Sequence, residues 1–285
     1  MVTIKLGDYN TLKMKEPALR EGYGEVFGIY LEGGEEGDIL MPQKYVPAGV
    51  KPGDMVDCFV YLDQDERLIA TTETPLAKVG DFAYLQCTWV NEYGAFLDWG
   101  VLKNLFCPFR EQKRHMEQGQ SYIVHIHIDE ESYRIVASAK VEGYLSDRFP
   151  TYNPGQEADL LVWQKTPLGF KVIIDNAFAG LIYDDQIFRP LHTGDRLKGY
   201  ITMVRADGKI DAAIQPSGRR QTLDFADTLL AYLNNHGGRC QLGDKSDPEA
   251  IKQLFNVSKK TYKKAVGQLF KQRLIKIYDD GIELV

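Results

Sequence analysis

The chain has 285 residues, of which 44% are hydrophobic and 26% charged, the composition of an ordinary globular protein. No segment is apolar over the length needed to cross a bilayer, and the first residues lack a secretory signal, so we expect a cytoplasmic protein without a membrane partner. The formal net charge of −6 argues mildly against a nucleic-acid partner for the chain as a whole. The four cysteines are scattered without a Cys-x-x-Cys pair, which argues against a zinc site and a disulfide framework.

One sequence pattern occurs three times at a constant internal spacing. A glycine in an apolar strand is followed by a second glycine 25 residues later, and then by two further apolar runs. The glycine pairs are Gly28 and Gly53, Gly94 and Gly119, and Gly169 and Gly194. A repeat of about 70 residues is too long for a solenoid turn and fits tandem small domains, which we place at 1–75, 76–146 and 147–216.

Each copy alternates apolar and polar residues over short runs broken by turn residues, which is typical of half-buried strands. In the second copy the strands are expected near 82–90, 94–99, 104–108, 121–128 and 134–139. Five short strands without a long helix predict a small closed barrel. The second glycine of each pair is expected to adopt a positive φ in a turn, and the first to let its strand bend.

This layout resembles the S1-type OB-fold. In the second copy the motifs that carry the resemblance are Gly94-Ala95-Phe96-Leu97, Asn104-Leu105-Phe106-Cys107-Pro108 and Gly119-Gln120-Ser121-Tyr122-Ile123-Val124. The resemblance implies that single-stranded RNA lies across the second and third strands. There, aromatic rings would stack on bases and basic groups would meet phosphates.

The second copy keeps the aromatic and charged positions of the S1 family best. The RNA contacts expected in it are Tyr93, Phe96, Trp99, Phe106, Arg110, Asp129 and Arg134. The third copy has charges where the second has rings, and its expected contacts are Lys171, Arg205 and Lys209. For any single ring, packing inside the barrel is the alternative.

The first copy differs in charge. It has 7 Lys and Arg against 14 Asp and Glu, whereas the second has 7 against 9 and the third 8 against 9. An acidic surface repels a polyanion. We therefore expect the first barrel to be structural or to face a protein partner.

From residue 217 the apolar period changes from two to 3.6, which marks a fourth domain at 217–285. Helices are expected at 221–235, after Asp247-Pro248 and from Ser258 to about residue 272, followed by a hairpin at 274–285. Three helices and a hairpin predict a winged helix, so the fold class is mainly β, with three tandem S1-like OB barrels before an α+β winged helix. The residues expected on the apolar face of the third helix are Tyr262, Ala265, Val266, Leu269 and Phe270.

The opposite face of the third helix is basic. Its lysines, which we expect to contact nucleic-acid phosphates, are Lys259, Lys260, Lys263, Lys264 and Lys271. No acidic residue occurs from Ser258 to Lys276. Lysines are point charges that read no bases, so affinity without sequence specificity is expected. A solvated basic face without a partner is the alternative.

No motif indicates catalysis. His125-x-His127-x-Asp129 places three potential metal ligands on one strand face, but the first copy has Phe59-x-Tyr61-x-Asp63 there, so we expect a structural or stacking role. No Ser-His-Asp or Cys-His constellation with local motif support is present. We therefore expect no enzymatic activity, metal or cofactor.

The whole arrangement resembles the bacterial conserved virulence factor B family of RNA-binding regulatory proteins. The most specific motifs are Ala70-Thr71-Thr72-Glu73-Thr74-Pro75, Gly94-Ala95-Phe96-Leu97-Asp98-Trp99-Gly100 and Ser258-Lys259-Lys260-Thr261-Tyr262-Lys263-Lys264-Ala265-Val266-Gly267. The resemblance implies a cytoplasmic protein that binds single-stranded RNA and influences gene expression without a cofactor.

Two alternatives to this function stay open. One is a scaffold that docks on ribosome, polymerase or RNase components, with the acidic first barrel as the contact. The other is a regulator whose winged helix binds duplex DNA or RNA.

Overall fold

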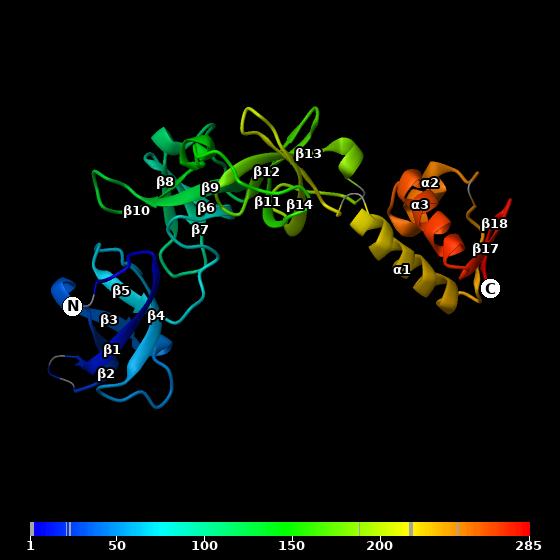
Figure 1. Ribbon diagram of the computed structural model, residues 1–285. Coiled ribbons are helices and arrows are strands. Elements are labelled where there is room, and N and C mark those ends of the chain that lie inside the picture. Colours follow the sequence, from blue (N-terminus) through cyan, green and yellow to red (C-terminus); the bar gives the residue numbers. More distant parts are fainter. Residues whose placement is uncertain (1–2, 21, 23, 188, 217–218, 244) are drawn as a thin grey trace. The chain divides into compact units, whose positions relative to one another are not determined.

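Three closed five-stranded barrels precede a domain of three helices and a small sheet, as the repeat and the change of period predict (Figure 1). The computed structural model describes residues 3–20, 22, 24–187, 189–216, 219–243 and 245–285, with the backbone alone at 219–224. The predicted fold class is confirmed. The chain divides into two compact units, Met1–Leu145 and Ser146–Val285. The four domain boundaries stay predictions, and residues 217–218 at the last of them lie outside the described residues.

All three barrels have the same topology, in which the third strand runs parallel to the fifth and the other neighbours are antiparallel. The first barrel consists of β1 (Asp8–Leu19), β2 (Val26–Glu32), β3 (Asp38–Pro42), β4 (Met55–Leu62) and β5 (Leu68–Thr71). The second consists of β6 (Phe82–Val90), β7 (Gly94–Asp98), β8 (Leu105–Pro108), β9 (Ser121–Ile128) and β10 (Ile135–Ser138). The third consists of β11 (Glu157–Thr166), β12 (Gly169–Ile174), β13 (Phe178–Tyr183), β14 (Arg196–Val204) and β15 (Ile210–Ala213).

The two repeated glycines have different physical roles. The second glycine of each pair has the positive φ that was predicted, 99° at Gly53, 82° at Gly119 and 96° at Gly194. The first lies where two strands come close together. A Cβ on Gly94 would lie 2.4 Å from the carbonyl oxygen of Cys107 on the next strand, and the equivalent glycines in the other barrels meet a facing carbonyl oxygen at 2.3 and 1.9 Å. The repeat spacing therefore preserves strand pairing as well as turns.

The C-terminal domain is a winged helix. It consists of α1 (Arg219–Asn235), α2 (Pro248–Phe255), α3 (Lys259–Lys271) and the strands β16 (Arg239–Cys240), β17 (Ile275–Tyr278) and β18 (Gly281–Leu284). The side chains of Asp247 and Ser258 cap α2 and α3 as expected, by accepting hydrogen bonds from backbone N–H groups. The short strand β16, which pairs with β18, was not predicted.

Within the first unit the two barrels share part of one hydrophobic core. Phe59, Tyr61 and Ile69 of the first barrel belong to the same buried cluster as Trp99 and Leu105 of the second. The segment between the barrels is fixed as well, since the Lys78 ammonium bonds both carboxylate oxygens of Asp8 at 2.9 Å. The first barrel is therefore packed against the second over an apolar contact.

The cysteines and the helices were also the subject of expectations from the sequence. Cys58, Cys87, Cys107 and Cys240 are all buried thiols. Over the described part of the chain, no helix combines the length and apolar character needed to span a membrane.

Candidate nucleic-acid interface

Four strands of the second barrel carry a continuous row of apolar side chains. The strand registers pair Trp89 with Phe96, Phe96 with Phe106, and Phe106 with Val136, so the row crosses β6, β7, β8 and β10. Side chains of directly paired residues lie on the same face of a sheet. The predicted residues Phe96 and Phe106 are therefore neighbours in one aromatic surface.

The ring of Trp89 extends this surface. It lies parallel to Phe96, with the ring centroids 4.4 Å apart and the planes at 8°, and Phe96 in turn lies 5.1 Å from Phe106. Trp89 is 45% exposed, and Tyr93, which follows β6, is 67% exposed. Nucleic-acid bases stack on exposed aromatic rings such as those of Trp89 and Tyr93. Trp89 was not among the contacts expected from the sequence.

The aromatic row is one side of a groove of about 650 Å³. Its lining includes Trp89, Tyr93, Phe96 and Phe106 from the second barrel. Leu62, Gln64 and Glu66, from the end of β4 and the turn that leads to β5, contribute from the first barrel. The groove is thus built by both barrels of the first unit.

Two cations lie in this groove. Arg134, a predicted contact, forms an ion pair with Glu66 of the first barrel and leaves 52% of its side chain exposed. The ammonium of Lys103 donates to the backbone oxygen of Asp63 at 2.6 Å, and burial lowers the pKa of this lysine. Arg134 is therefore the cation of the groove that is better placed to meet a phosphate.

Arg110 and Asp129, two of the expected contacts, lie outside the lining of this groove and pair with each other. Arg110 lies 2.6 Å from Asp129 and 3.3 Å from Glu131. Asp129 also accepts hydrogen bonds from the backbone N–H and the hydroxyl of Ser132, which hold the pKa of its carboxyl below the usual value. Asp129 thus orders the turn between β9 and β10, and its carboxylate forms an ion pair with Arg110.

Trp99 is a correction to the expected contacts. Its side chain is only 2% exposed, and its ring packs edge-on against Phe59 and Tyr61 of the first barrel. Its indole N–H donates to the backbone oxygen of Lys103 at 2.7 Å. Trp99 is among the residues that line the groove, but its ring is packed in the contact between the barrels and is almost completely covered.

The corresponding row of the third barrel is polar. Its register pairs Gln164 with Lys171, Lys171 with Leu181, and Leu181 with Asp211. The predicted cations of this barrel have partners of their own. The ammonium of Lys171 lies 5.2 Å from the ring centre of Trp163, Arg205 bonds Asp211 at 3.0 Å, and Lys209 bonds Asp207 at 2.7 Å.

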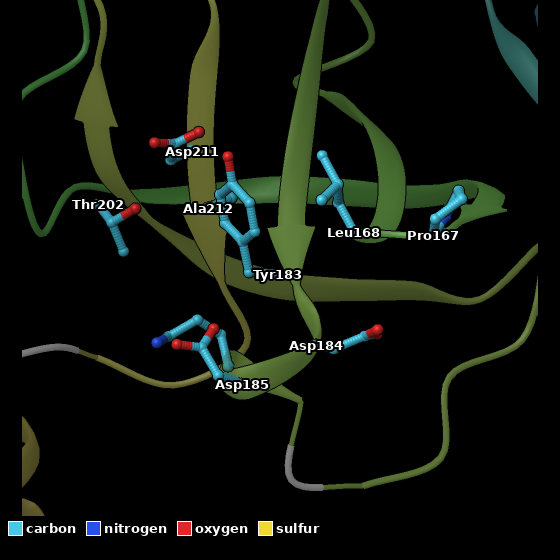
Figure 2. A pocket seen from close by; sticks show the side chains of 9 residues that line it. Pro167, Leu168, Tyr183, Asp184, Asp185, Thr202, Asp211 and Ala212 are labelled. Atoms are coloured by element: carbon cyan, nitrogen blue, oxygen red, sulfur yellow. The ribbon is translucent and has the colours of Figure 1, made fainter.

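Next to this row is a pocket of about 580 Å³. Figure 2 shows Tyr183 in its middle, with Leu168 on one side and Asp211 on the other. Asp184 and Asp185 complete an acidic lining. The third barrel therefore has mainly polar and acidic side chains where the second has the aromatic row.

The winged helix presents its predicted lysines on an exposed face of α3. Lys260, Lys264 and Lys271 fall within about 40° of one another around the helix axis. Lys263 and Phe270 occupy the adjacent stripe. Phe270 was expected in the core but is 53% exposed, because it lies next to this basic face. Lys259 instead bonds the backbone oxygen of Ser246 at 2.8 Å.

The two histidines of the His125-x-His127-x-Asp129 run lie among aromatic rings. His125 is buried against the rings of Phe82 and Tyr144, and the Tyr144 hydroxyl lies 3.1 Å from Nε2 of His127. In the parts of the chain that the structure describes, no three His, Cys, Asp or Glu side chains gather around a possible ion. The histidines belong to a ring cluster.

Comparisons with known proteins agree with this architecture. A family model for the S1 domain matches residues 6–73, and one described as the CvfB-like winged helix domain matches residues 227–284. The chain is 25% identical over 263 residues to the uncharacterized protein YitL of Bacillus subtilis. The alignment covers 90% of this chain and 87% of that protein. It is 22% identical over 239 residues to conserved virulence factor B of Staphylococcus saprophyticus. That alignment covers 81% of this chain and 80% of the other protein.

One solved structure covers nearly the whole chain. It is a crystal structure of a multidomain protein with nucleic acid binding domains from Streptococcus pneumoniae. The identity is 22%, the coverage is 98% of each chain, and the TM-score is 0.42.

The fold and the matched domains define a chain of S1-type barrels that ends in a winged helix, an architecture that indicates nucleic-acid binding. The resemblance expected from the sequence is confirmed, since the chain is homologous to the conserved virulence factor B proteins over about four fifths of its length and carries their type of winged helix.

Proposed function

We propose that the protein binds single-stranded RNA in the groove of the second barrel and thereby influences gene expression, without catalysing a reaction. The observation that supports this most strongly is the row formed by Trp89, Phe96 and Phe106. Stacking on aromatic rings tolerates any base, and it requires bases that are not already stacked in a duplex. Trp89 is exposed at one end of the row, the exposed Tyr93 lines the same groove, and so does Arg134.

In this proposal different residues contact the bases and the phosphates. Stacking on Trp89 and Phe96 contributes about 1–3 kcal/mol per base. Arg134 supplies a phosphate contact that depends on salt. In the third barrel Lys171, Arg205 and Lys209 stay predicted contacts, although a phosphate would have to displace a carboxylate from Arg205 and from Lys209.

The exposed face of α3 is a second contact in this proposal. Four exposed lysines and the ring of Phe270 combine the charge and the stacking surface that suit a single strand. A duplex of DNA or RNA in contact with the same lysines is the second candidate, because α3 takes the position of the recognition helix in a winged helix.

Binding measurements on the full chain test the proposal. We expect fluorescence anisotropy to show tighter binding of an unstructured 12-nucleotide RNA than of a duplex of the same length. Phe96→Ala should weaken RNA binding by about 1–3 kcal/mol. The matched control is Phe109→Ala, because Phe109 follows β8 in the same barrel but does not line the groove. Equal affinity of the wild type and Phe96→Ala for RNA would remove the stacking claim, and a preference for duplex would favour the second candidate.

A further inference from the structure

We infer that the first barrel supplies a functional wall of the RNA groove, in which Glu66 competes with an RNA phosphate for Arg134. This inference rests on the proposed function of the second barrel. It departs from the expectation that the acidic first barrel takes no part in RNA binding.

The wall is formed by the hairpin that joins β4 to β5. Leu62, Gln64 and Glu66 line the groove together with Trp89 and Phe96. The amide of Gln64 is exposed, and the carboxylate of Glu66 meets the guanidinium of Arg134. A strand stacked on the second barrel would therefore lie beside polar groups of the first.

The hairpin is held in place from both sides. Asp63 accepts hydrogen bonds from the backbone N–H groups of Asp65 and Arg67, each at 2.9 Å, and from the guanidinium of Arg67 at 2.8 Å. From the second barrel, the ammonium of Lys103 donates to the backbone oxygen of Asp63 at 2.6 Å. Glu66 thus stands at a fixed position beside Arg134.

The backbone of this turn does not itself require a glutamate. Glu66 has a φ of 64°, in the left-handed region that disfavours residues with a Cβ, and Gly208 has a φ of 81° before Lys209, the third-barrel equivalent of Arg67. Glycine would take this conformation without strain. What the glutamate adds is its carboxylate, which neutralises the arginine that the groove offers to a phosphate.

The ion pair is open enough to be exchanged. The side chains of Arg134 and Glu66 are 52% and 43% exposed, and exposed ion pairs of this kind are weak because water screens them. A phosphate offers the guanidinium the same bidentate geometry as a carboxylate. RNA can therefore replace Glu66 on Arg134, at the cost of leaving a carboxylate close to the strand.

The test is Glu66→Gln in the full chain, with the unstructured 12-nucleotide RNA as the probe. Glutamine keeps the size of the side chain and removes its charge. We expect affinity to rise by about two- to tenfold at low salt. We also expect the slope of log affinity against log salt to steepen by up to about 0.7, the value for one more phosphate contact on a single strand.

Two variants separate local competition from a general change of charge. Asp65→Asn removes the same charge from the same hairpin, but Asp65 pairs with Arg67 and does not line the groove. In an Arg134→Gln background, Glu66→Gln should bring no gain, because the contested group is gone. Melting temperatures of all variants show whether each is folded.

An equal gain from Asp65→Asn, or a full gain in the Arg134→Gln background, would overturn the inference and leave RNA binding by the second barrel intact. If Phe96→Ala weakens binding while Glu66→Gln changes nothing, the inference alone fails. A wild-type chain that binds no RNA would instead remove the proposed function.

Discussion

The indole of Trp89 lies parallel to the ring of Phe96, with their centroids 4.4 Å apart and their planes at 8°, because β6 has a bulge between Cys87 and Trp89. Strict alternation along β6 would turn Trp89 inward, since Leu85 and Cys87 are buried. The bulge at Thr88 adds one residue and turns the indole outward.

Trp89→Ala should therefore weaken RNA binding. The variant removes the outermost ring of the row, with an expected loss of about 1–3 kcal/mol in binding free energy. Titration followed by anisotropy measures it. Tyr84→Ala is the matched control, because Tyr84 is an exposed ring on the same strand that does not line the groove. A comparable loss in both variants would argue against the row as the binding surface.

Trp99→Phe tests the contact between the first two barrels. It removes the hydrogen bond from the indole to the backbone oxygen of Lys103 and leaves that part-buried oxygen without this donor. We expect the free energy of unfolding to fall by about 1–3 kcal/mol. Urea denaturation measures the loss, and Trp89→Phe at an exposed site should show little change. An equal effect of the two substitutions on stability would contradict the interface role.

Gly94→Ala tests why the repeat keeps its first glycine. The new methyl group would lie 2.4 Å from the carbonyl oxygen of Cys107, so β7 and β8 must move apart. A loss of about 1–3 kcal/mol in stability is expected, as for other overpacked sites. Thermal unfolding measures it against Gly143→Ala, since a Cβ on Gly143 meets nothing within 4 Å. A melting temperature no lower than that of Gly143→Ala would show that the close approach is dispensable.

The buried ring cluster predicts a dependence of stability on pH. Burial lowers the pKa of His125 to about 4, from 6.5. The unfolded chain therefore takes up this proton first as the pH falls, and His125 costs stability progressively between pH 6.5 and 4, up to about 3 kcal/mol.

Unfolding free energies of His125→Phe and the wild type over this range measure the effect. The variant should lose less stability on acidification than the wild type. His115→Phe at an exposed site serves as the control. Parallel pH profiles of wild type and His125→Phe would contradict the argument.

The lysines of α3 are expected to set part of the salt dependence. Lys260→Glu with Lys264→Glu should flatten the slope of log RNA affinity against log salt, since phosphate contacts release counterions. Lys245→Glu with Lys252→Glu makes the same charge change in the same domain, at positions outside α3. A slope that the two double variants share would assign the effect to net charge and not to this helix.

The fold of each barrel could be predicted from the sequence, but the groove that the first two barrels form together could not. Spacing and alternation were sufficient for the barrels, because these depend on local patterns within one copy, and the resemblance to the S1 family pointed to Phe96 and Phe106. Trp99 follows the best-preserved motif, yet it is buried by Phe59 and Tyr61, which no pattern within its own copy could indicate. The place of Glu66 in the groove could not be predicted for the same reason, since this residue belongs to the first copy and the rings belong to the second.

The bulge in the first strand recurs in every barrel, between Met14 and Glu16, Cys87 and Trp89, and Val162 and Gln164. In each barrel the bulge aligns one residue from each of four strands, as in the row from Trp89 to Val136 in the second barrel. Substitutions in this row can change the ligand preference while the barrel core stays as it is. Grafting the second barrel's residues onto the third, as Gln164→Trp, Lys171→Phe and Leu181→Phe, would transplant a base-stacking surface. The three barrels therefore share one framework, and each could gain or lose a ligand by substitutions along a single line across the sheet.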